Sequence, residues 1–257
     1  MSVLSYLQNM ASAAVLSNTE KNSITKSIST LRMRLESCFG DELVDHFQFG
    51  SSTRDTILPR NMDEHSDIDY LIVFKEDGSV PQTFLNRLKR FADNNYRTSE
   101  IRQSKPTIVL ELNHIKFDLV PAIPRMWLSG YKIPDSDGGW MGTNPNDFNQ
   151  DLIDKNKSEG NFIKPTIRLM KYWNAANGYP FESYGLEKRI TDHGFWSCAS
   201  QKDYLFYVFD RLNPSDCNRT VGDKVERAKT IVAQIRAFEN QDKPVAAESK
   251  VRKLIPE

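Results

Sequence analysis

The sequence lacks several features that would place it in a large class of proteins. Its 34 basic and 34 acidic residues leave no net charge, whereas proteins that bind long nucleic acids usually carry a basic excess. No apolar run approaches the roughly 20 residues that span a bilayer, and no signal peptide is recognisable. Only three cysteines are present, Cys38, Cys198 and Cys217, without metal-site spacing. These absences favour a cytoplasmic protein with reduced thiols that binds neither a membrane nor long nucleic acid.

The composition is that of an ordinary globular protein. The chain has 257 residues, of which 39% are hydrophobic and 26% charged. This length allows one large domain or two small ones, each with a sizeable core. Because the chain carries no net charge, a nucleotide ligand is expected to be a small nucleotide rather than a polynucleotide.

Two acidic residues stand at the start of a predicted strand. The apolar runs Phe47 to Phe49 and Tyr70 to Phe74 predict adjacent strands, and Asp67 and Asp69 precede the second run. Because side chains alternate along a strand, the two carboxylates point to the same face. At about 4 Å and an effective dielectric constant near 20, their repulsion costs roughly 4 kcal/mol. Such a pair predicts a cation between the carboxylates, and oxygen ligands of this kind suit Mg²⁺.

A third acid is predicted on a neighbouring strand. Residues 107–112 and 115–120 are two strand-like runs joined by Asn113-His114, which predicts a hairpin. In the second run Ile115, Phe117 and Leu119 share the core face, whereas Lys116 and Asp118 share the polar face. The pattern therefore predicts a two-metal phosphoryl-transfer site, with Asp67, Asp69 and Asp118 as catalytic residues and metal ligands.

A short glycine-containing turn lies just upstream of the acid pair. Gly50-Ser51 follows the first predicted strand. A strand-turn-helix that opens with glycine exposes backbone N–H groups and a hydroxyl that can bind a phosphate. Gly50 and Ser51 are therefore candidate nucleotide-binding residues.

Together these residues resemble the polymerase-β-type nucleotidyltransferase superfamily. The fuller string over residues 50–74 is similar to one branch of it, the bacterial cyclic-GMP-AMP-synthase-like enzymes (CD-NTases) that make cyclic oligonucleotides for antiphage signalling. The residues of the connector that match this branch are Thr56, Leu58, Pro59, Arg60 and Ser66. The resemblance continues through residues 117–122, 133–145, 167–174 and 183–187.

The resemblance implies an α+β fold with two lobes and a central cleft. A nucleotidyltransferase lobe with a mixed sheet and an N-terminal spine helix would occupy residues 1–150, and a helical domain residues 151–257. It places Lys171 and Ser183 against a nucleotide triphosphate, and we add the neighbouring Tyr184 to the nucleotide-binding candidates.

The resemblance also implies cofactors and partners. Two Mg²⁺ ions are expected, with Mn²⁺ as a substitute, and ATP, GTP or both as substrates. A regulatory protein partner is compatible with the family, and the protein is expected to be a monomer.

Other segments carry structural expectations. Residues 1–40 predict helices, with an N-cap around Ser17. The prolines and glycines of residues 121–146 predict an irregular loop. On a helix near residue 170, Lys164, Arg168 and Lys171 are spaced to form a basic stripe opposite an apolar arc.

Three functions remain compatible with the sequence. The first is synthesis of a cyclic di- or oligonucleotide from NTPs with release of pyrophosphate. The second is template-independent addition of nucleotides to an RNA end or a protein. The third is a catalytically inactive nucleotide-binding module, which the presence of all three acids disfavours.

Overall fold

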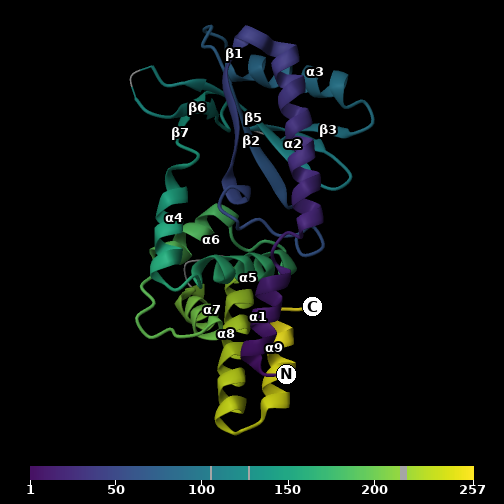
Figure 1. The fold of residues 1–257 in the computed structure, drawn as a ribbon. Helices are drawn as coiled ribbons and strands as arrows, with labels where there is room; N and C mark the ends of the chain where they lie inside the picture. The colour runs from purple at the N-terminus through teal and green to yellow at the C-terminus, as the bar shows by residue number, and fades with distance from the viewer. Residues whose placement is uncertain (105, 127, 215–218) are drawn as a thin grey trace. The chain divides into compact units, whose positions relative to one another are not determined.

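The computed structural model of the protein describes residues 1–104, 106–126, 128–214 and 219–257 (Figure 1). Contacts divide the chain into two compact units. The first, which we call the sheet unit, comprises Ser17–Arg60 and His65–Asn149. The second, the helical unit, comprises Met1–Leu16, Asn61–Glu64 and Gln150–Glu257. Units defined by contacts differ from functional domains, so the domains 1–150 and 151–257 stay a prediction.

The sheet unit is built on a mixed sheet in the order β1-β2-β5-β4-β3, with β6 paired to β5 and β7 paired to β6. Strands β2 and β5 run parallel, and the other described pairs are antiparallel. The strands are β1 (Leu43–Phe49), β2 (Asp67–Phe74), β3 (Glu100–Ser104), β4 (Thr107–Glu111), β5 (Lys116–Pro124), β6 (Tyr131–Pro134) and β7 (Trp140–Thr143). The predicted strands around Phe49, Tyr70 and Phe117 are thereby confirmed, as is the β4–β5 hairpin.

One face of the sheet is covered by two helices, α2 (Asn18–Phe39) and α3 (Pro81–Asn95), which run alongside the strands in Figure 1. The ring of Phe74 packs against Phe39 and Phe84, with centroids 5.1 and 5.2 Å apart. Helix α2 begins with a capping box, in which Ser17 and Glu20 each accept a hydrogen bond from the other's backbone N–H. The packing of α2 and α3 on the sheet buries the side chains of β2 that point away from Asp67 and Asp69.

The opposite face divides into a polar end and an apolar end. Beyond the aspartates, the side chains of Leu71, Val73, Val120 and Ala122 form a buried cluster. Partly buried side chains cover this cluster, namely Phe47, Phe49, Tyr131 and Ile133. The apolar end fixes the register of β2 against β5, because a slip of β2 by one residue would turn Leu71 and Val73 out of the cluster and carry Asp67 and Asp69 to the helix-covered face.

The helical unit contains α1 (Val3–Ala13), α5 (Ile163–Ala176), α6 (Ser183–Asp192), α7 (Gln201–Arg211), α8 (Arg219–Asn240) and α9 (Pro244–Leu254). Helix α4 (Asp147–Ser158) begins at the end of the sheet unit and continues into this one. The N-terminal helix belongs here because the Tyr6 hydroxyl donates a 2.6 Å hydrogen bond to the carbonyl of Ile255. Residues from the two ends of the described chain therefore share one core.

One expectation about local structure was wrong. Residues 121–146 are not simply irregular, because β5 continues to Pro124 and a short hairpin of β6 and β7 follows. On α5, Arg168 and Lys171 of the predicted basic stripe are buried together with the neighbouring apolar residues of that helix. Packing on all sides of the helix overrides the amphipathic pattern that its sequence suggests.

Among the described residues, no helix is both long enough and apolar enough to cross a membrane. Cys38 and Cys198 are free thiols, and Cys217 lies outside the described residues.

The Tyr6–Ile255 hydrogen bond can be tested by Tyr6→Phe. The change leaves a buried carbonyl without its donor, so we expect a loss of about 1 to 2 kcal/mol in the free energy of unfolding. For a chain of this size that lowers Tm by roughly 2–8 °C. The control is Tyr207→Phe, because the Tyr207 hydroxyl makes no hydrogen bond to a described residue. Equal melting temperatures for the two variants would contradict the prediction.

Candidate active site

Three carboxylates share the sheet face opposite α2 and α3, at the polar end of β2 and β5. The parallel register pairs Asp69 with Asp118 and Asp67 with Lys116. Paired residues of neighbouring strands lie about 5 Å apart and point to the same side. The parallel pairing therefore brings to one face the acids that the sequence placed on two separate strands.

The Gly50 turn is packed directly against one of these acids. Residues Gly50–Ser52 form a 3-10 turn after β1 rather than an α-helix, and Gly50 has a positive φ of 75°. A Cβ atom at this position would lie 1.9 Å from Oδ2 of Asp69. Glycine is thus required both by the backbone conformation and by the space that the Asp69 carboxylate occupies.

The Asp118 carboxylate lies in a partly dehydrated setting. Burial, with the neighbouring negative charge of Asp67, raises the pKa of Asp118 to about 6. The Lys116 ammonium acts in the opposite direction but is the smaller effect. Oδ1 of Asp118 is buried and has no hydrogen-bond partner within the described structure. A carboxyl group with this pKa can hold or release a proton near neutral pH.

A lysine lies between two of the acids. The Nζ atom of Lys116 is 3.1 Å from Oδ2 of Asp67 and 3.8 Å from Oδ1 of Asp118. Its side chain is only 11% exposed. Burial lowers the pKa of Lys116, but Asp67 and Asp118 together outweigh that effect and leave its pKa raised. Sequence reasoning gave this residue no role, although strand alternation had already placed it on the polar face beside Asp118.

The donor set fits Mg²⁺ in type. The carboxylates are hard oxygen ligands. The buried Oδ1 atom of Asp118 accepts no hydrogen bond from a described residue, so it is available to coordinate a metal ion. As the described side chains are arranged, however, no group of three or more His, Cys, Asp or Glu residues is close enough to hold a metal ion. Two of the three acids instead face the Lys116 ammonium. Asp67, Asp69 and Asp118 remain the predicted ligands.

The other predicted nucleotide-binding residues lie in the helical unit. The Lys171 ammonium, on α5, forms a buried ion pair with Glu187 of α6 at 3.2 Å. Ser183 begins α6 and lies one turn before Glu187, so the two side chains share a helix face. Tyr184 is 47% exposed on the same first turn. The structure thus brings Lys171 and the start of α6 together, and their role in nucleotide binding stays a prediction.

A further ion pair borders the acids. The Arg60 guanidinium is 2.6 Å from Oε1 of Glu111 on β4, and Glu111 is paired with Lys116 in the sheet. Arg60 was a matching residue of the connector, whereas Glu111 was not singled out. The contact could not be predicted from the sequence because Glu111 lies far from Arg60 along the chain.

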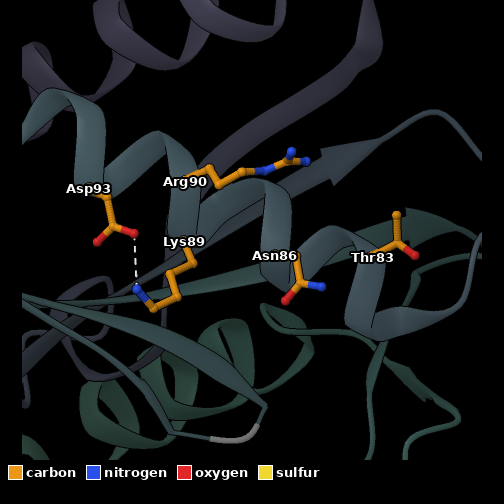
Figure 2. A pocket seen from close by; sticks show the side chains of 5 residues that line it. All are labelled: Thr83, Asn86, Lys89, Arg90 and Asp93. Atoms are coloured by element: carbon orange, nitrogen blue, oxygen red, sulfur yellow. Dashed lines mark hydrogen bonds and ion pairs between the residues drawn. The ribbon is translucent and has the colours of Figure 1, made fainter.

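A hollow elsewhere in the sheet unit offers a contrast. Figure 2 shows it along one face of α3, where the ammonium of Lys89 bonds to Asp93 at 2.9 Å. Its side chains are Thr83, Asn86, Lys89, Arg90 and Asp93. All come from a single helix, and none is a buried polar group without a partner among the described residues. The acid-bearing face is therefore the better candidate for catalysis.

Sheet, glycine turn and acids define a nucleotidyltransferase-like protein, and comparison with known proteins identifies the family. Residues 1–156 match the model of the Second Messenger Oligonucleotide or Dinucleotide Synthetase domain. The match covers more than half of the chain, so the protein belongs to this family. The predicted resemblance to the CD-NTases is confirmed.

Two curated relatives are similar in sequence. A probable cyclic nucleotide synthase of Bacillus cereus (strain VD146) is 31% identical over 124 residues, which cover 44% of this chain and 38% of the relative. A cyclic AMP-AMP-AMP synthase of Acinetobacter sp. is 25% identical over 211 residues, covering 77% of this chain and 61% of the relative. The chain thus aligns with less than two thirds of either relative.

A solved structure shares the fold. The Vibrio cholerae DncV cyclic AMP-GMP synthase, in complex with the linear intermediate 5′ pppA(3′,5′)pG, superposes with a TM-score of 0.78 at 13% identity. The alignment covers 96% of this chain and 93% of that one. The predicted α+β fold is therefore confirmed.

The contact between Gly50 and Asp69 can be tested by Gly50→Ala. We expect about 1–2 kcal/mol of backbone strain and, because the new methyl group displaces the Asp69 carboxylate, about a 100-fold loss of nucleotidyltransferase activity. Gly78→Ala is the matched control, since Gly78 has a φ of 77° and no atom within 4 Å of an added Cβ. The control should show similar strain with normal activity. Equal activity of the two variants would contradict the contact.

Asp118→Asn should stabilise the protein at neutral pH. The folded-state pKa of about 6 exceeds the ordinary value of 3.8, so the ionised carboxylate destabilises the fold above pH 6. In EDTA we expect the variant to gain about 1–2 kcal/mol at pH 7.5, and the gain to vanish as the pH falls toward 4.

The comparison is with Asp77→Asn, at an exposed carboxylate that accepts a hydrogen bond from the Ser79 backbone. Hydrogen bonds from the Ser79 side chain and backbone, with a smaller contribution from Arg87, lower the pKa of Asp77, so its replacement should destabilise the protein at neutral pH. Urea unfolding across this pH range measures both variants. A pH-independent effect of Asp118→Asn would refute the assignment.

Proposed function

We propose that this protein is a Mg²⁺-dependent nucleotidyltransferase that joins NTPs into a cyclic di- or oligonucleotide second messenger, with release of pyrophosphate. One observation carries the proposal. Asp67, Asp69 and Asp118 lie on one face of two parallel strands, with the Gly50 turn packed on Asp69. No structural gain explains three carboxylates on one small surface, whereas phosphoryl transfer requires them.

The acids and the turn have distinct roles in this proposal. Asp118, which lies on the same face as the other two acids, accepts the proton of the acceptor hydroxyl. The hydroxyl oxygen forms a bond to the α-phosphorus, the bond from that phosphorus to the bridging oxygen breaks, and pyrophosphate leaves. Gly50 and Ser51 bind the phosphates through backbone N–H groups and the hydroxyl. Two or more rounds of the same transfer close a ring.

The remaining groups bind the ions and the nucleotide. Asp67, Asp69 and Asp118 would hold two Mg²⁺ ions, or Mn²⁺ in their place, which polarise the phosphate and neutralise its charge. We propose that Lys171, Ser183 and Tyr184 bind the triphosphate, as the family resemblance implies.

The relatives support the choice of substrates. One is named for a product made of AMP units, and DncV was solved with an intermediate that contains A and G. We therefore propose ATP, GTP or both as substrates. We further propose, on the family resemblance, a monomeric protein of the cytoplasm that acts in antiphage (CBASS-type) signalling and responds to a regulatory protein partner.

The proposal is tested by Asp67→Asn and Asp69→Asn in the full chain. Both variants should fold normally and lose about 100-fold or more of pyrophosphate release with NTPs and Mg²⁺, because the chemistry depends on these carboxylates. Asp93→Asn on the exposed surface of α3 is the control and should be fully active. Near-normal turnover by either Asp67→Asn or Asp69→Asn would contradict the proposal.

The nature of the product separates the competing functions. Wild-type protein is incubated with labelled NTPs alone, and the product is treated with phosphatase and weighed by mass spectrometry. A phosphatase-resistant species of two or more nucleotides supports ring closure and names the bases. Incorporation only when RNA or protein is added would instead favour transfer to an RNA end or a protein.

A further inference from the structure

Lys116 is held between the acids by the sheet itself. It lies two residues before Asp118 on β5 and pairs with Asp67 across to β2, so its side chain shares their face. Its ammonium lies 3.1 Å from Asp67 and 3.8 Å from Asp118. Both distances are within ion-pair range, and the contact with Asp67 is the closer one.

This arrangement puts a positive charge among ligands predicted for a metal ion. Within the described residues no three carboxylates converge closely enough to hold an ion, and two of the three instead face the ammonium. The buried Oδ1 of Asp118 still lacks a hydrogen-bond donor. An ammonium therefore offsets the repulsion between Asp67 and Asp118, but it does not satisfy all of their oxygen atoms.

The charge balance has a consequence for metal binding. The formal charges of Asp67, Asp69, Asp118 and Lys116 add up to −2, which one divalent ion would neutralise. Two divalent ions bring two more positive charges than these four side chains offset, and the phosphates of an NTP supply the difference. The adjoining Arg60–Glu111 pair adds no net charge. Lysine suits a reversible role because its ammonium is a compact charge on a flexible stem.

We propose that Lys116 is a positioning residue that serves as a built-in counter-ion, holding Asp67 and Asp118 in the nucleotide-free protein and opposing divalent-ion binding until NTP arrives. The inference rests on the proposed function, because it takes the three acids as metal ligands. It predicts that the nucleotide-free protein binds divalent ions weakly and that removal of the Lys116 charge strengthens this binding.

The test measures Mn²⁺ binding to the full chain without nucleotide, from the electron paramagnetic resonance signal of free Mn²⁺. Lys116→Met keeps the length of the side chain and removes the charge, so Mn²⁺ should bind about tenfold tighter or more. Lys116→Arg keeps the charge and should bind as the wild type does. Lys132→Met is the control, since the Lys132 ammonium lies on β6 within 3.8 Å of Glu76.

A second measurement covers a folding defect. Thermal unfolding in EDTA should show that Lys116→Met is less stable than the wild type, because Asp67 and Asp118 then repel each other without a counter-ion. When Mn²⁺ is supplied in place of EDTA, the variant should regain that stability. If that variant does not fold, Lys116→Gln replaces it, with the same expectation. Unchanged or weaker Mn²⁺ binding by the folded neutral variant overturns the inference and leaves Lys116 as a plain ion pair.

The result also separates this inference from the proposed function. Wild-type protein is titrated with Mn²⁺ in the presence of a non-hydrolysable ATP analogue, and Asp67→Asn is titrated in parallel. One outcome would refute only the role of Lys116. In it, the analogue promotes Mn²⁺ binding and Asp67→Asn abolishes that binding, but Lys116→Met does not change Mn²⁺ binding in the absence of nucleotide. If Asp67→Asn never affects Mn²⁺ binding, the metal site and the proposed function fail together.

Discussion

The parallel pairing of β2 with β5 is the constraint on which the candidate site depends. Each strand contributes acids at its beginning and buried apolar side chains further along. The apolar cluster around Leu71 and Val120 cannot be kept in place if the register slips, so hydrophobic burial at one end aligns Asp69 with Asp118 at the other. The core thereby supplies the free energy that holds mutually repelling carboxylates together.

Much of the sheet and of the acidic site could be predicted from the sequence because strand alternation is a local rule. It located Asp67, Asp69 and Asp118 and placed Lys116 beside them without any knowledge of the fold. The role of Lys116 was missed because it depends on pairing with a strand almost 50 residues away. The Arg60–Glu111 contact is nonlocal in the same way and carries no local signal.

Where the sequence misled, tertiary packing outweighed a local pattern. The prolines between residues 121 and 134 suggested an irregular loop, yet Pro121 and Pro124 lie within β5. On α5 the spacing predicted a basic stripe, but it gave no sign that Arg168 and Lys171 are buried or that Lys171 forms an ion pair with Glu187. A buried charge next to its partner has the same sequence pattern as an exposed one.

The Lys171–Glu187 pair joins two adjacent helices through charges that solvent hardly reaches. Without Glu187 the Lys171 ammonium would lose its ion-pair partner in the interior, and such a loss typically costs about 3–5 kcal/mol. A substitution at one of these positions is therefore expected to be accompanied by a change at the other. In related chains, we expect residues at the two positions to covary even where the rest of the helical unit has diverged.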